Sequence, residues 1–513
     1  MLSQSGPAPP AQRPIVLVVS HGLSGHLAPM LRIAAALHNL SWNIYFLGPT
    51  AHAERITATG ATFFPLRGTA DLDDKAYYES PPVKGYNSLH WSERVMLDFR
   101  YQCIEPIPEQ WSCVKEALQT IRRKKPERQI VVLAEAFFLG IMPLRYGAPL
   151  DSDSASSANP KIVRPKSLCV SVTVPAIRSV DLPPSGYPVP YDPSPSGQAR
   201  NAALWRGWTK RAKDLTVLLE TKMREAGATE PVGEVFLSGA NYKCHSKILQ
   251  LGVPGFEYPR SDWPDGFQFA GLVQGRALPK KNSETPIEDR KGEQLDSLPR
   301  NPQETNGHPT KTPPTSKPPF PWWPALESNS QLPHHSPARK RIIVVSQGTV
   351  EINPQDLIIP TIEAFSTRPD ILIIVILGWK GATLSLTSSA MDDIPPNTHV
   401  ADYLSYDAVL PHADVWVHNA GFGAINHGIA NGVPMVVAGE GMDKTENARR
   451  VAWSGIGIDL ETATPSSDQV REAIEQVLRE DEFTQRVQIL ARESEATDCF
   501  QVIHDELMSL SVL

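Results

Sequence analysis

The sequence predicts an α/β protein built from two doubly wound halves, each with a parallel sheet covered by helices. Unbroken β-branched runs such as PIVLVVS (14–20) and RIIVVSQGT (341–349) suit strands that are buried on both faces. Helical stretches alternate with these runs, and a long polar region separates the two series. With 513 residues the chain is also too long for one ordinary core.

The first half begins with a βαβ unit. The strand at 14–20 leads through the loop HGLSGH into a helix with apolar residues at helical spacing, and NIYFLG (43–48) returns to strand character. Strand-like runs at 130–133 and 167–173 extend the pattern. We expect a disordered tail over 1–13, a domain over 14–275 and a polar loop at 151–165 within it.

The second half follows a linker. Residues 276–320 are rich in Pro, Ser, Thr, Asn, Lys and Glu and are predicted to be disordered, whereas Trp322 and Trp323 should dock onto a domain surface. We expect the second domain over 321–490, with strands at 341–349, 371–377 and ADVWVHN (413–419). Residues 491–513 are predicted to form a helix that packs back on the first domain.

Composition excludes several classes of protein. A hydrophobic fraction of 41% with a net charge of −7 suits a globular protein and argues against a general nucleic-acid binder. The strongest apolar run, ILIIVIL (371–377), is too short to cross a bilayer, and the N-terminus lacks a secretory signal. We therefore expect a cytoplasmic protein, with peripheral membrane contact left open. The five cysteines lack zinc or redox spacing, so no metal or cofactor is expected.

The stretch from Asp414 to Leu460 carries the strongest signal of function. In doubly wound sheets, ligands bind outside the carboxyl ends of the strands. Gly421 and Gly423 let the backbone approach a ligand, and a helix expected to begin near Ala424 would point its unpaired N–H groups toward a diphosphate. The dinucleotide pattern G-x-G-x-x-G fails, because its third glycine position is Asn426.

The string NAGFGAINHGIANGVP (419–434), followed by DKTENA, resembles the nucleotide-sugar site of the family 1, UDP-glycosyltransferase-like enzymes. The resemblance spans both halves. The segment EYPRSDWP (257–264) and the double tryptophan make it most similar to a fungal branch that has an asparagine in place of the diphosphate-binding histidine and an Asp-Lys pair. It implies the GT-B fold, in which two Rossmann-like domains face each other across a cleft.

The resemblance also implies a donor site in the second domain. Tyr403 falls at the position that stacks on the nucleotide base, and SQGT (346–349) matches the phosphate loop. His427 takes the place of a ribose-binding glutamate, with an ordinary helix-face residue as the alternative, and Lys444 replaces a sugar-binding glutamine. The implied donor residues are Ser346, Thr349, Tyr403, Asn419, Gly421, Phe422, Gly423, His427, Asp443 and Lys444.

Asp443 has a second expected role. In D-K-T-E, Glu446 follows three residues later, which predicts a capping-box-like helix start. Both roles can hold together, because a capping aspartate at the edge of a cleft can also accept hydrogen bonds from sugar hydroxyls.

The first half supplies the predicted catalytic base. Transfer of a sugar to an alcohol needs a group that removes the hydroxyl proton, and imidazole suits this near neutral pH. GHLAP (25–29) matches the family pattern G-H-x-x-P and places His26 at a helix start, with His21 as the alternative base. Glu135 stands where the family has an aspartate and would orient the ring; a strand-end salt bridge is its alternative.

The acceptor pocket is expected in the first half, with apolar side chains that the sequence alone does not separate from the core: Trp91, Phe99, Trp111, Phe137 and Phe138. Together these features predict an inverting glycosyltransferase. It would move a sugar, most simply glucose, from a UDP-sugar to a hydroxyl of a small lipophilic acceptor such as a secondary metabolite or sterol. The alternatives are a nucleotide-sugar epimerase on the same fold and a non-catalytic nucleotide-sugar-binding protein.

Overall fold

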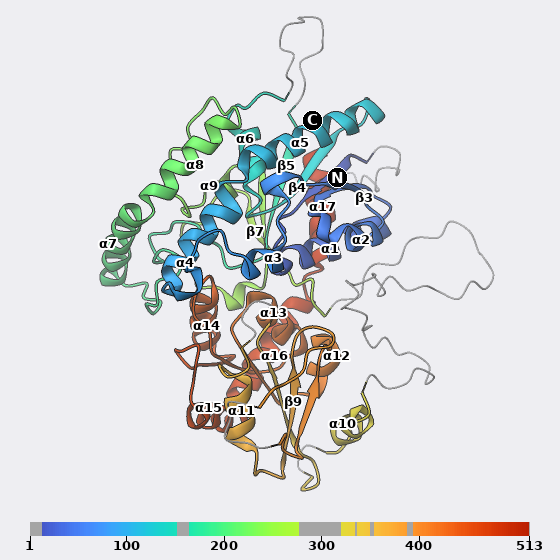
Figure 1. The fold of residues 1–513 in the computed structure, drawn as a ribbon, viewed down its shortest axis with the longest axis vertical. Helices are drawn as coiled ribbons and strands as arrows, with labels where there is room; N and C mark the ends of the chain where they lie inside the picture. Colours follow the sequence, from blue (N-terminus) through green and yellow to red (C-terminus); the bar gives the residue numbers. More distant parts are fainter. Residues whose placement is uncertain are drawn as a thin grey trace, which may run out of the picture.

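Two parallel sheets, one in each half of the chain, organise the computed structural model (Figure 1). The structure describes residues 13–150, 164–275, 320–333, 336–348, 353–386 and 393–511. The predicted loop at 151–165 and the predicted linker at 276–320 therefore lie almost wholly outside the described residues, and Thr349 lies outside them too. The predicted fold class, α/β with two doubly wound sheets, is confirmed.

The first sheet has seven strands in the order β3-β2-β1-β4-β5-β6-β7, and every pair is parallel. Its central strands are buried along their whole length, as unbroken apolar runs require. The strands are β1 (Ile15–Val19), β2 (Asn43–Gly48), β3 (Thr62–Pro65), β4 (Ile130–Glu135), β5 (Lys166–Ser171), β6 (Lys247–Leu251) and β7 (Phe267–Gly271).

Helices cover both faces of this sheet. One apolar core includes α5 and the tryptophans of α7, and the other includes α1 and the C-terminal α17. The helices of this half are α1 (Ser24–Asn39), α2 (Ala53–Ala58), α3 (Asp74–Glu79), α4 (Trp91–Asp98), a π-helical turn (Phe99–Ile104), α5 (Ile107–Lys124), α6 (Met142–Arg145), α7 (Pro195–Arg211), α8 (Lys213–Glu225) and α9 (Ala240–Lys243).

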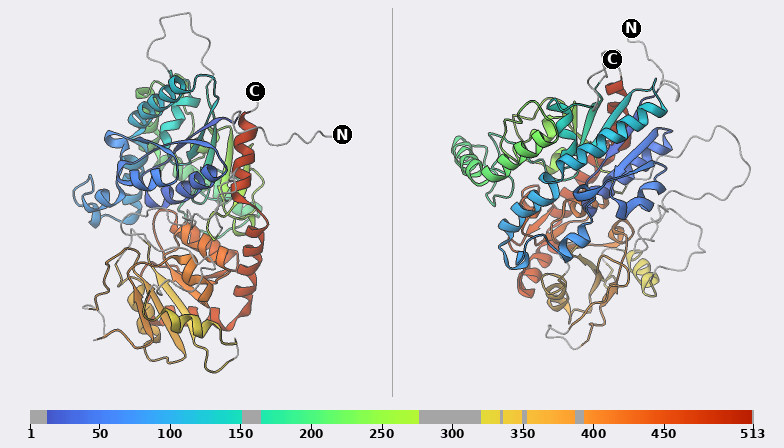
Figure 2. Two further views of the ribbon diagram at one scale, coloured as in Figure 1. Left: turned by 90° about the vertical axis from the view of Figure 1, so that its right-hand side faces the viewer. Right: turned by 45° about the horizontal axis from the view of Figure 1, so that its top comes forward.

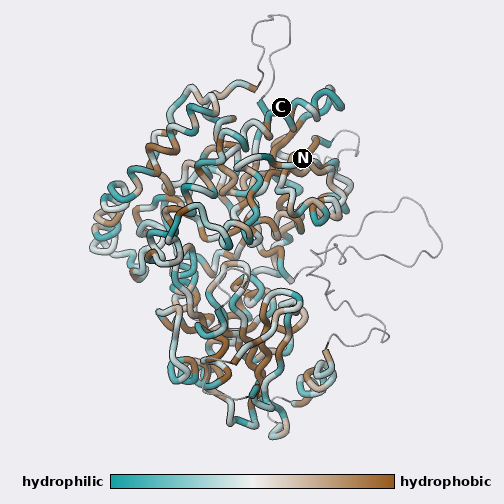
Figure 3. The backbone as a smooth tube through the Cα atoms, in the orientation of Figure 1, coloured by the Kyte–Doolittle hydropathy of each residue, from teal (hydrophilic) through white to brown (hydrophobic). Residues whose placement is uncertain are grey.

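The second sheet has six parallel strands in the order β10-β9-β8-β11-β12-β13. The hydropathy colouring concentrates apolar residues in the interior of both halves and polar residues on the outer helices (Figure 3). The strands are β8 (Arg341–Ser346), β9 (Ile371–Ile376), β10 (Thr398–Ala401), β11 (Val415–His418), β12 (Met435–Val437) and β13 (Gly457–Asp459).

The helices of the second half are α10 (Trp323–Ser330), α11 (Ile358–Phe365), α12 (Tyr406–Val409), α13 (Phe422–Asn431), α14 (Lys444–Trp453), α15 (Ser467–Arg479) and α16 (Asp481–Glu495). The ring of Trp322 stacks on His399 of β10, with ring centroids 5.2 Å apart, and Trp323 is buried, so the double tryptophan docks on the second domain as predicted. No helix among the described residues is long and apolar enough to cross a membrane.

The two halves are joined by more than the connecting chain. After α16 the chain crosses back, and α17 (Cys499–Ser511) packs on the first half against α1 and the sheet (Figure 2). A separate apolar cluster joins Val253 and Leu272 of the first half to Phe422 and Ile429 of α13. The carboxyl ends of both sets of strands consequently face each other across a shared cleft.

Candidate active site

The predicted base and its predicted partner lie side by side at the carboxyl edge of the first sheet. His26 is in the first turn of α1, and Glu135 is the last residue of β4, the strand next to β1. His26 Nδ1 lies 2.9 Å from Glu135 Oε1, and the glutamate side chain is fully buried. Because a carboxylate only accepts, Nδ1 carries the hydrogen, and in the neutral ring Nε2 keeps its lone pair. His26, which is 21% exposed, lines the cleft.

The surroundings of His26 affect its pKa in opposite directions. Burial lowers the pKa, but the charge and hydrogen bond of Glu135, with a contribution from Asp443, outweigh it and raise the pKa above the ordinary value. Glu135 Oε1 also accepts the backbone N–H of Phe137 at 3.0 Å, which fixes the carboxylate. The pair is therefore arranged to take up a proton at Nε2 and to stabilise the imidazolium that results.

His21, the alternative base, is placed differently. Its ring is buried, and it is absent from the residues that line the cleft. Nε2 donates to the carbonyl of Gln102 at 2.7 Å, and Nδ1 accepts the backbone N–H of Leu23 at 3.2 Å. Burial, followed by the charge of a protonated His26, lowers the pKa of His21. Both ring nitrogens are occupied, so the geometry favours His26 as the base.

The cleft between the halves has a volume of about 530 Å³, within the range of small-molecule sites. The sequence-predicted donor residues that the structure describes all line it, opposite His26: Ser346, Tyr403, Asn419, Gly421, Phe422, Gly423, His427, Asp443 and Lys444. Thr349 cannot be placed, because it lies outside the described residues. The structure thus brings together residues that are up to 418 positions apart, from His26 to Lys444.

The glycine turn leads directly into α13. The helix begins at Phe422, two residues before the predicted start near Ala424, and Gly421 occupies the N-cap position with no side chain to cap the helix. Ala420, with φ of 59°, makes the turn. A Cβ atom on Gly423 would meet nothing within 4 Å, so the space beside the first turn is open. The N–H end of a ten-residue helix therefore points into the cleft.

The two residues before this turn have separate environments. His418 is buried against Trp416, with ring centroids 4.5 Å apart, and burial lowers the pKa of His418 to about 3. It belongs to the core. Asn419 lines the cleft, and its side-chain amide donates to the carbonyl of Gln347 in the loop after β8. This contact joins the glycine turn to the predicted phosphate loop.

His427 has a partner that the sequence did not indicate. Its Nδ1 donates to Asp407 Oδ1 at 2.7 Å, and Asn431 donates to the same oxygen at 2.9 Å. The other carboxylate oxygen of Asp407 accepts the backbone N–H of Gly275, from the first half, at 3.2 Å. His427 therefore lines the cleft from the face of α13, with its ring oriented by Asp407.

The predicted capping box at the start of α14 is wrong. Asp443 precedes the helix, but its side chain makes no capping hydrogen bond, because its backbone is already in the helical region at φ −93° and ψ −4°. Its carboxylate instead accepts the hydroxyl of Thr173, from the loop after β5, at 2.5 Å. Glu446 accepts the backbone N–H of Gly186 at 2.6 Å. Both acidic residues therefore connect α14 to the first half.

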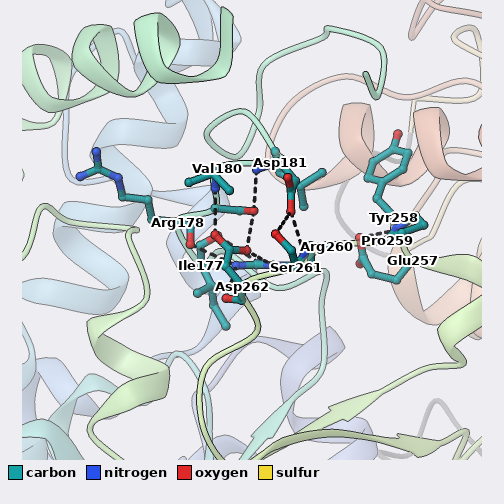
Figure 4. Close-up of polar contacts among 12 residues, drawn as sticks. Ile177, Arg178, Val180, Asp181, Glu257, Tyr258, Pro259, Arg260, Ser261 and Asp262 are labelled. Atoms are coloured by element: carbon teal, nitrogen blue, oxygen red, sulfur yellow. Dashed lines mark hydrogen bonds and ion pairs between the residues drawn. The ribbon is translucent and has the colours of Figure 1, made fainter. Parts of the chain in front are cut away.

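Sequence reasoning used EYPRSDWP only as a sign of resemblance and missed its structural role. The segment lies beside the long loop after β5 and contacts it through several hydrogen bonds (Figure 4). Arg260 donates to the carbonyls of Ile177 and Arg178, Asp262 accepts the backbone N–H of Val180 at 2.8 Å, and Asp181 accepts from Ser261. The opposite charges of Arg260 and Asp262, between Pro259 and Pro264, were the available signal.

The same segment contacts the second half. Glu257 accepts from Arg450 of α14, with Nη2 to Oε1 at 2.8 Å, and both side chains are nearly fully buried. The guanidinium also lies 4.5 Å from the centroid of the Tyr258 ring and 3.1 Å from Glu446. These contacts hold the loop after β5, which carries Thr173, against α14, which follows Asp443.

The five aromatic residues considered for the acceptor pocket do not line the cleft. Trp111 and Phe138 are fully buried core residues, and Phe137 is nearly so, with its ring edge against His26 at a centroid distance of 5.8 Å. Trp91 and Phe99 are partly buried. The first-half residues that do line the cleft near His26 include Leu23, Arg55, Asp74, Tyr78 and Thr173.

Comparison with known proteins identifies the family. The chain is 30% identical over 511 residues to UDP-glucosyltransferase 1 of Beauveria bassiana, covering 97% of this chain and 95% of the relative. The chain belongs to the UDP-glycosyltransferase family. UDP-glucosyltransferase B1 of Starmerella bombicola is 28% identical over 98% of this chain and 99% of its own length. The predicted class of enzyme, a UDP-dependent hexosyltransferase, is confirmed.

Further comparisons agree with the family. Residues 382–510 match the family described as "Erythromycin biosynthesis protein CIII-like, C-terminal domain". Among solved structures, the glycotransferase of kitacinnamycin superposes with a TM-score of 0.63 at 17% identity, over 99% of this chain and 100% of that chain. The glycosyltransferase VinC, solved with dTDP, gives 0.55 at 14% identity over 97% and 99% of the two chains. These likenesses show the GT-B fold.

Proposed function

We propose that this UDP-glycosyltransferase transfers glucose from UDP-glucose, with inversion, to a hydroxyl group of a small lipophilic acceptor. The observation that carries the proposal is the His26–Glu135 pair: Nδ1 contacts the carboxylate, and His26 lines the same cleft as the glycine turn and Asp443. Several relatives that cover nearly the whole chain are named UDP-glucosyltransferases, which supports glucose as the sugar.

In the proposed reaction, His26 Nε2 removes the proton of the acceptor hydroxyl while its oxygen attacks the anomeric carbon of the sugar. The bond from that carbon to the diphosphate oxygen breaks, UDP leaves, and the attack from the opposite face inverts the configuration. Glu135 stabilises the imidazolium, as the acidic member of a catalytic triad does. Each step is a proton or electron-pair movement between the two substrates and one side chain.

Negative charge develops on the departing diphosphate, and we assign its stabilisation to the donor wall. The N–H end of α13 at Phe422 and Gly423 supplies oriented dipoles, and the Lys444 ammonium supplies a positive charge. Ser346, the last residue of β8, and Asn419, in the turn after β11, also line the cleft, with Thr349 expected beside them from the sequence.

The remaining donor contacts follow from position in the cleft. We assign the base to Tyr403, the ribose to the His427 Nε2 that Asp407 orients, and the sugar hydroxyls to the Asp443 carboxylate that Thr173 contacts. The acceptor would enter from the first half near Leu23 and Tyr78. Relatives with names such as 4'-demethylrebeccamycin synthase, from Lentzea aerocolonigenes, and Oleandomycin glycosyltransferase, from Streptomyces antibioticus, support a secondary metabolite as acceptor.

The experiment is a donor and acceptor screen read by mass spectrometry. The protein is incubated with UDP-glucose, UDP-galactose, UDP-glucuronate or dTDP-glucose and with pooled phenolic, terpenoid and sterol alcohols. We expect a glucosylated product with UDP-glucose, and none with the His26→Ala variant. Epimerised UDP-sugar in the absence of acceptor would indicate the epimerase alternative, and donor binding without any product would indicate a binding protein.

A further inference from the structure

His21 connects the loop of the proposed base to the wall that faces the acceptor. Its side chain is 1% exposed, and its ring centroid lies 6.0 Å from that of His26. A carbonyl oxygen only accepts a hydrogen bond, so the 2.7 Å contact with Gln102 requires a hydrogen on Nε2. Nδ1 then accepts the N–H of Leu23 at 3.2 Å, which fixes the backbone at the N-cap of α1, three residues before His26.

The partner of His21 is an atom that the local helix leaves unpaired. Gln102 lies in the π-helical turn Phe99–Ile104, where the i+5 pattern would pair its carbonyl with the amide of Ile107; at the return to the α-helical i+4 pattern the partner would be the amide of residue 106. That residue is Pro106, which has no N–H. The residue is also buried, so an unpaired carbonyl here would cost free energy. His21 Nε2 donates to this carbonyl in place of the N–H that proline lacks at the i+4 position.

The side chain of Gln102 extends the connection toward the cleft. Its amide donates to the hydroxyl of Tyr78 at 3.4 Å, and Tyr78 lines the cleft beside His26. The acceptor-side wall has a further contact of this kind. The buried Asp98 accepts hydrogen bonds from the hydroxyls of Tyr77 and Tyr86, at 2.9 and 2.7 Å.

A second contact joins the same two elements. The backbone N–H of Ser24, the first residue of α1, donates to Asp74 of α3 at 2.9 Å. α3 also carries Tyr77 and Tyr78. The base loop therefore meets the acceptor-side wall at two points, the His21 ring and the start of α1.

We propose that His21 is a positioning residue, which sets the orientation of His26 by locking the loop 20–26 to the π-helical turn of the acceptor-side wall. This rests on the proposed role of His26 as the base. Two consequences follow. Loss of the His21 contacts should reduce kcat and kcat/KM for the acceptor substrate while leaving the binding of the sugar donor intact. A side chain that keeps one hydrogen-bond donor and one hydrogen-bond acceptor should restore much of the activity.

The test uses the full-length protein and three variants. His21→Phe fills the space but has no ring nitrogen, whereas His21→Gln keeps an N–H donor and an oxygen acceptor. His245→Phe is the control, because His245 is a partly buried histidine that does not line the cleft. Its Nδ1 lies 3.0 Å from Ser167 Oγ, near the amino end of β5. Thermal unfolding checks that each variant is folded, and His26→Ala tests the underlying function separately.

Initial rates are measured from pH 5.5 to 9 with UDP-glucose and the acceptor that the screen identifies. For His21→Phe we expect kcat/KM for the acceptor to fall about 100-fold, the effect of misplacing a reacting group by about 1 Å. The Kd of UDP by calorimetry should not change. His21→Gln should recover most of the lost kcat/KM and should still show a rise of kcat/KM with pH, the ascending limb of the profile. His245→Phe should resemble the wild type.

A readout that needs no turnover accompanies the kinetics. Diethyl pyrocarbonate modifies neutral imidazoles, and peptide mapping gives the rate at His26 alone. We expect this rate to rise in His21→Phe, as the ring leaves Glu135, and to return in His21→Gln. Kinetics and labelling of His21→Phe that both match His245→Phe would overturn the proposal. An ascending pH limb that disappears in His21→Gln would also overturn it, since His21 would then be the base.

Discussion

Replacement of Glu135 by glutamine tests the central pair most directly. The change removes one negative charge but little volume. Oε1 of the glutamine can still accept from His26 Nδ1 and from the N–H of Phe137, as the glutamate does at 2.9 and 3.0 Å. Oε2 of Glu135 is buried and accepts no hydrogen bond from a described residue. The new amide nitrogen would therefore be an unpaired donor, at a cost of about 1–3 kcal/mol in stability.

The effect on chemistry is larger. Two opposite charges about 4 Å apart attract by about 4 kcal/mol at the effective dielectric constant of ~20 that suits proteins. The carboxylate provides this attraction only after His26 takes up the proton. Part of it is offset by the hydrogen bond that the amide keeps. We therefore expect kcat to fall about 10²- to 10³-fold, or about 3–4 kcal/mol in the barrier.

The pH dependence has a definite sign. The base works only when His26 is neutral, so kcat/KM rises with pH through the pKa of His26. Although burial lowers that pKa, Glu135 raises it above the ordinary value. Glu135→Gln should therefore move the ascending limb to lower pH while the plateau falls. Glu135→Asp keeps the charge and should leave the limb nearly in place, with a plateau reduced by the shorter reach.

The assay is initial-rate kinetics from pH 5.5 to 9 with saturating UDP-glucose, alongside thermal unfolding of each variant. UDP binding, measured by calorimetry, serves as the control. Glu135 lies on β4 in the first half of the protein, whereas the proposed donor site lies in the second half, so UDP binding should not change. A folded Glu135→Gln protein with an unchanged limb and a plateau close to that of the wild type would refute the coupling of the two side chains.

Three further predictions concern the donor wall and its attachment. Gly423→Ala should stabilise α13 by about 0.5–1 kcal/mol, since its Cβ meets nothing within 4 Å, yet weaken UDP binding in calorimetry if the diphosphate approaches there. Thr173→Val removes the hydroxyl that contacts Asp443 and should cost about 0.5–1.5 kcal/mol in kcat/KM for UDP-glucose, with Thr173→Ser close to the wild type. Glu257→Gln removes one of the two carboxylates that pair with the buried Arg450 guanidinium and leaves Glu446, so unfolding in guanidinium chloride should show a loss of about 1.5–3 kcal/mol; a loss typical of exposed pairs would contradict this.

The sequence predicted the fold class because its main signals are local. Buried parallel strands must be continuously apolar, and the runs at β1, β2, β8 and β9 carry that pattern with boundaries within a few residues of those observed. The glycine turn and GHLAP were found for the same reason, since each is a short string with a fixed spacing. The fold then brought His26 and Glu135 together from neighbouring strand ends.

Features that depend on tertiary contacts were missed. Asp407 lies 20 positions before His427 on another helix, and nothing local marks the two as partners. The capping box failed because the three-residue spacing of Asp443 and Glu446 is necessary but not sufficient, and the first half supplies other partners for both carboxylates. Apolar periodicity does not separate pocket from core either, which is why Trp111 and Phe138 were considered for the acceptor.

The donor residues that the resemblance implies make contacts that would suit them to the proposed roles. A histidine in place of a carboxylate loses an acceptor for ribose hydroxyls unless its tautomer is fixed, and Asp407 fixes it by accepting from Nδ1. Asp407 also accepts the N–H of Gly275 from the first half. If His427 contacts the ribose, donor binding and the relative position of the two halves become coupled at this carboxylate. Asp407→Asn should then weaken UDP binding more than the loss of one hydrogen bond explains, because the amide cannot accept from all three donors.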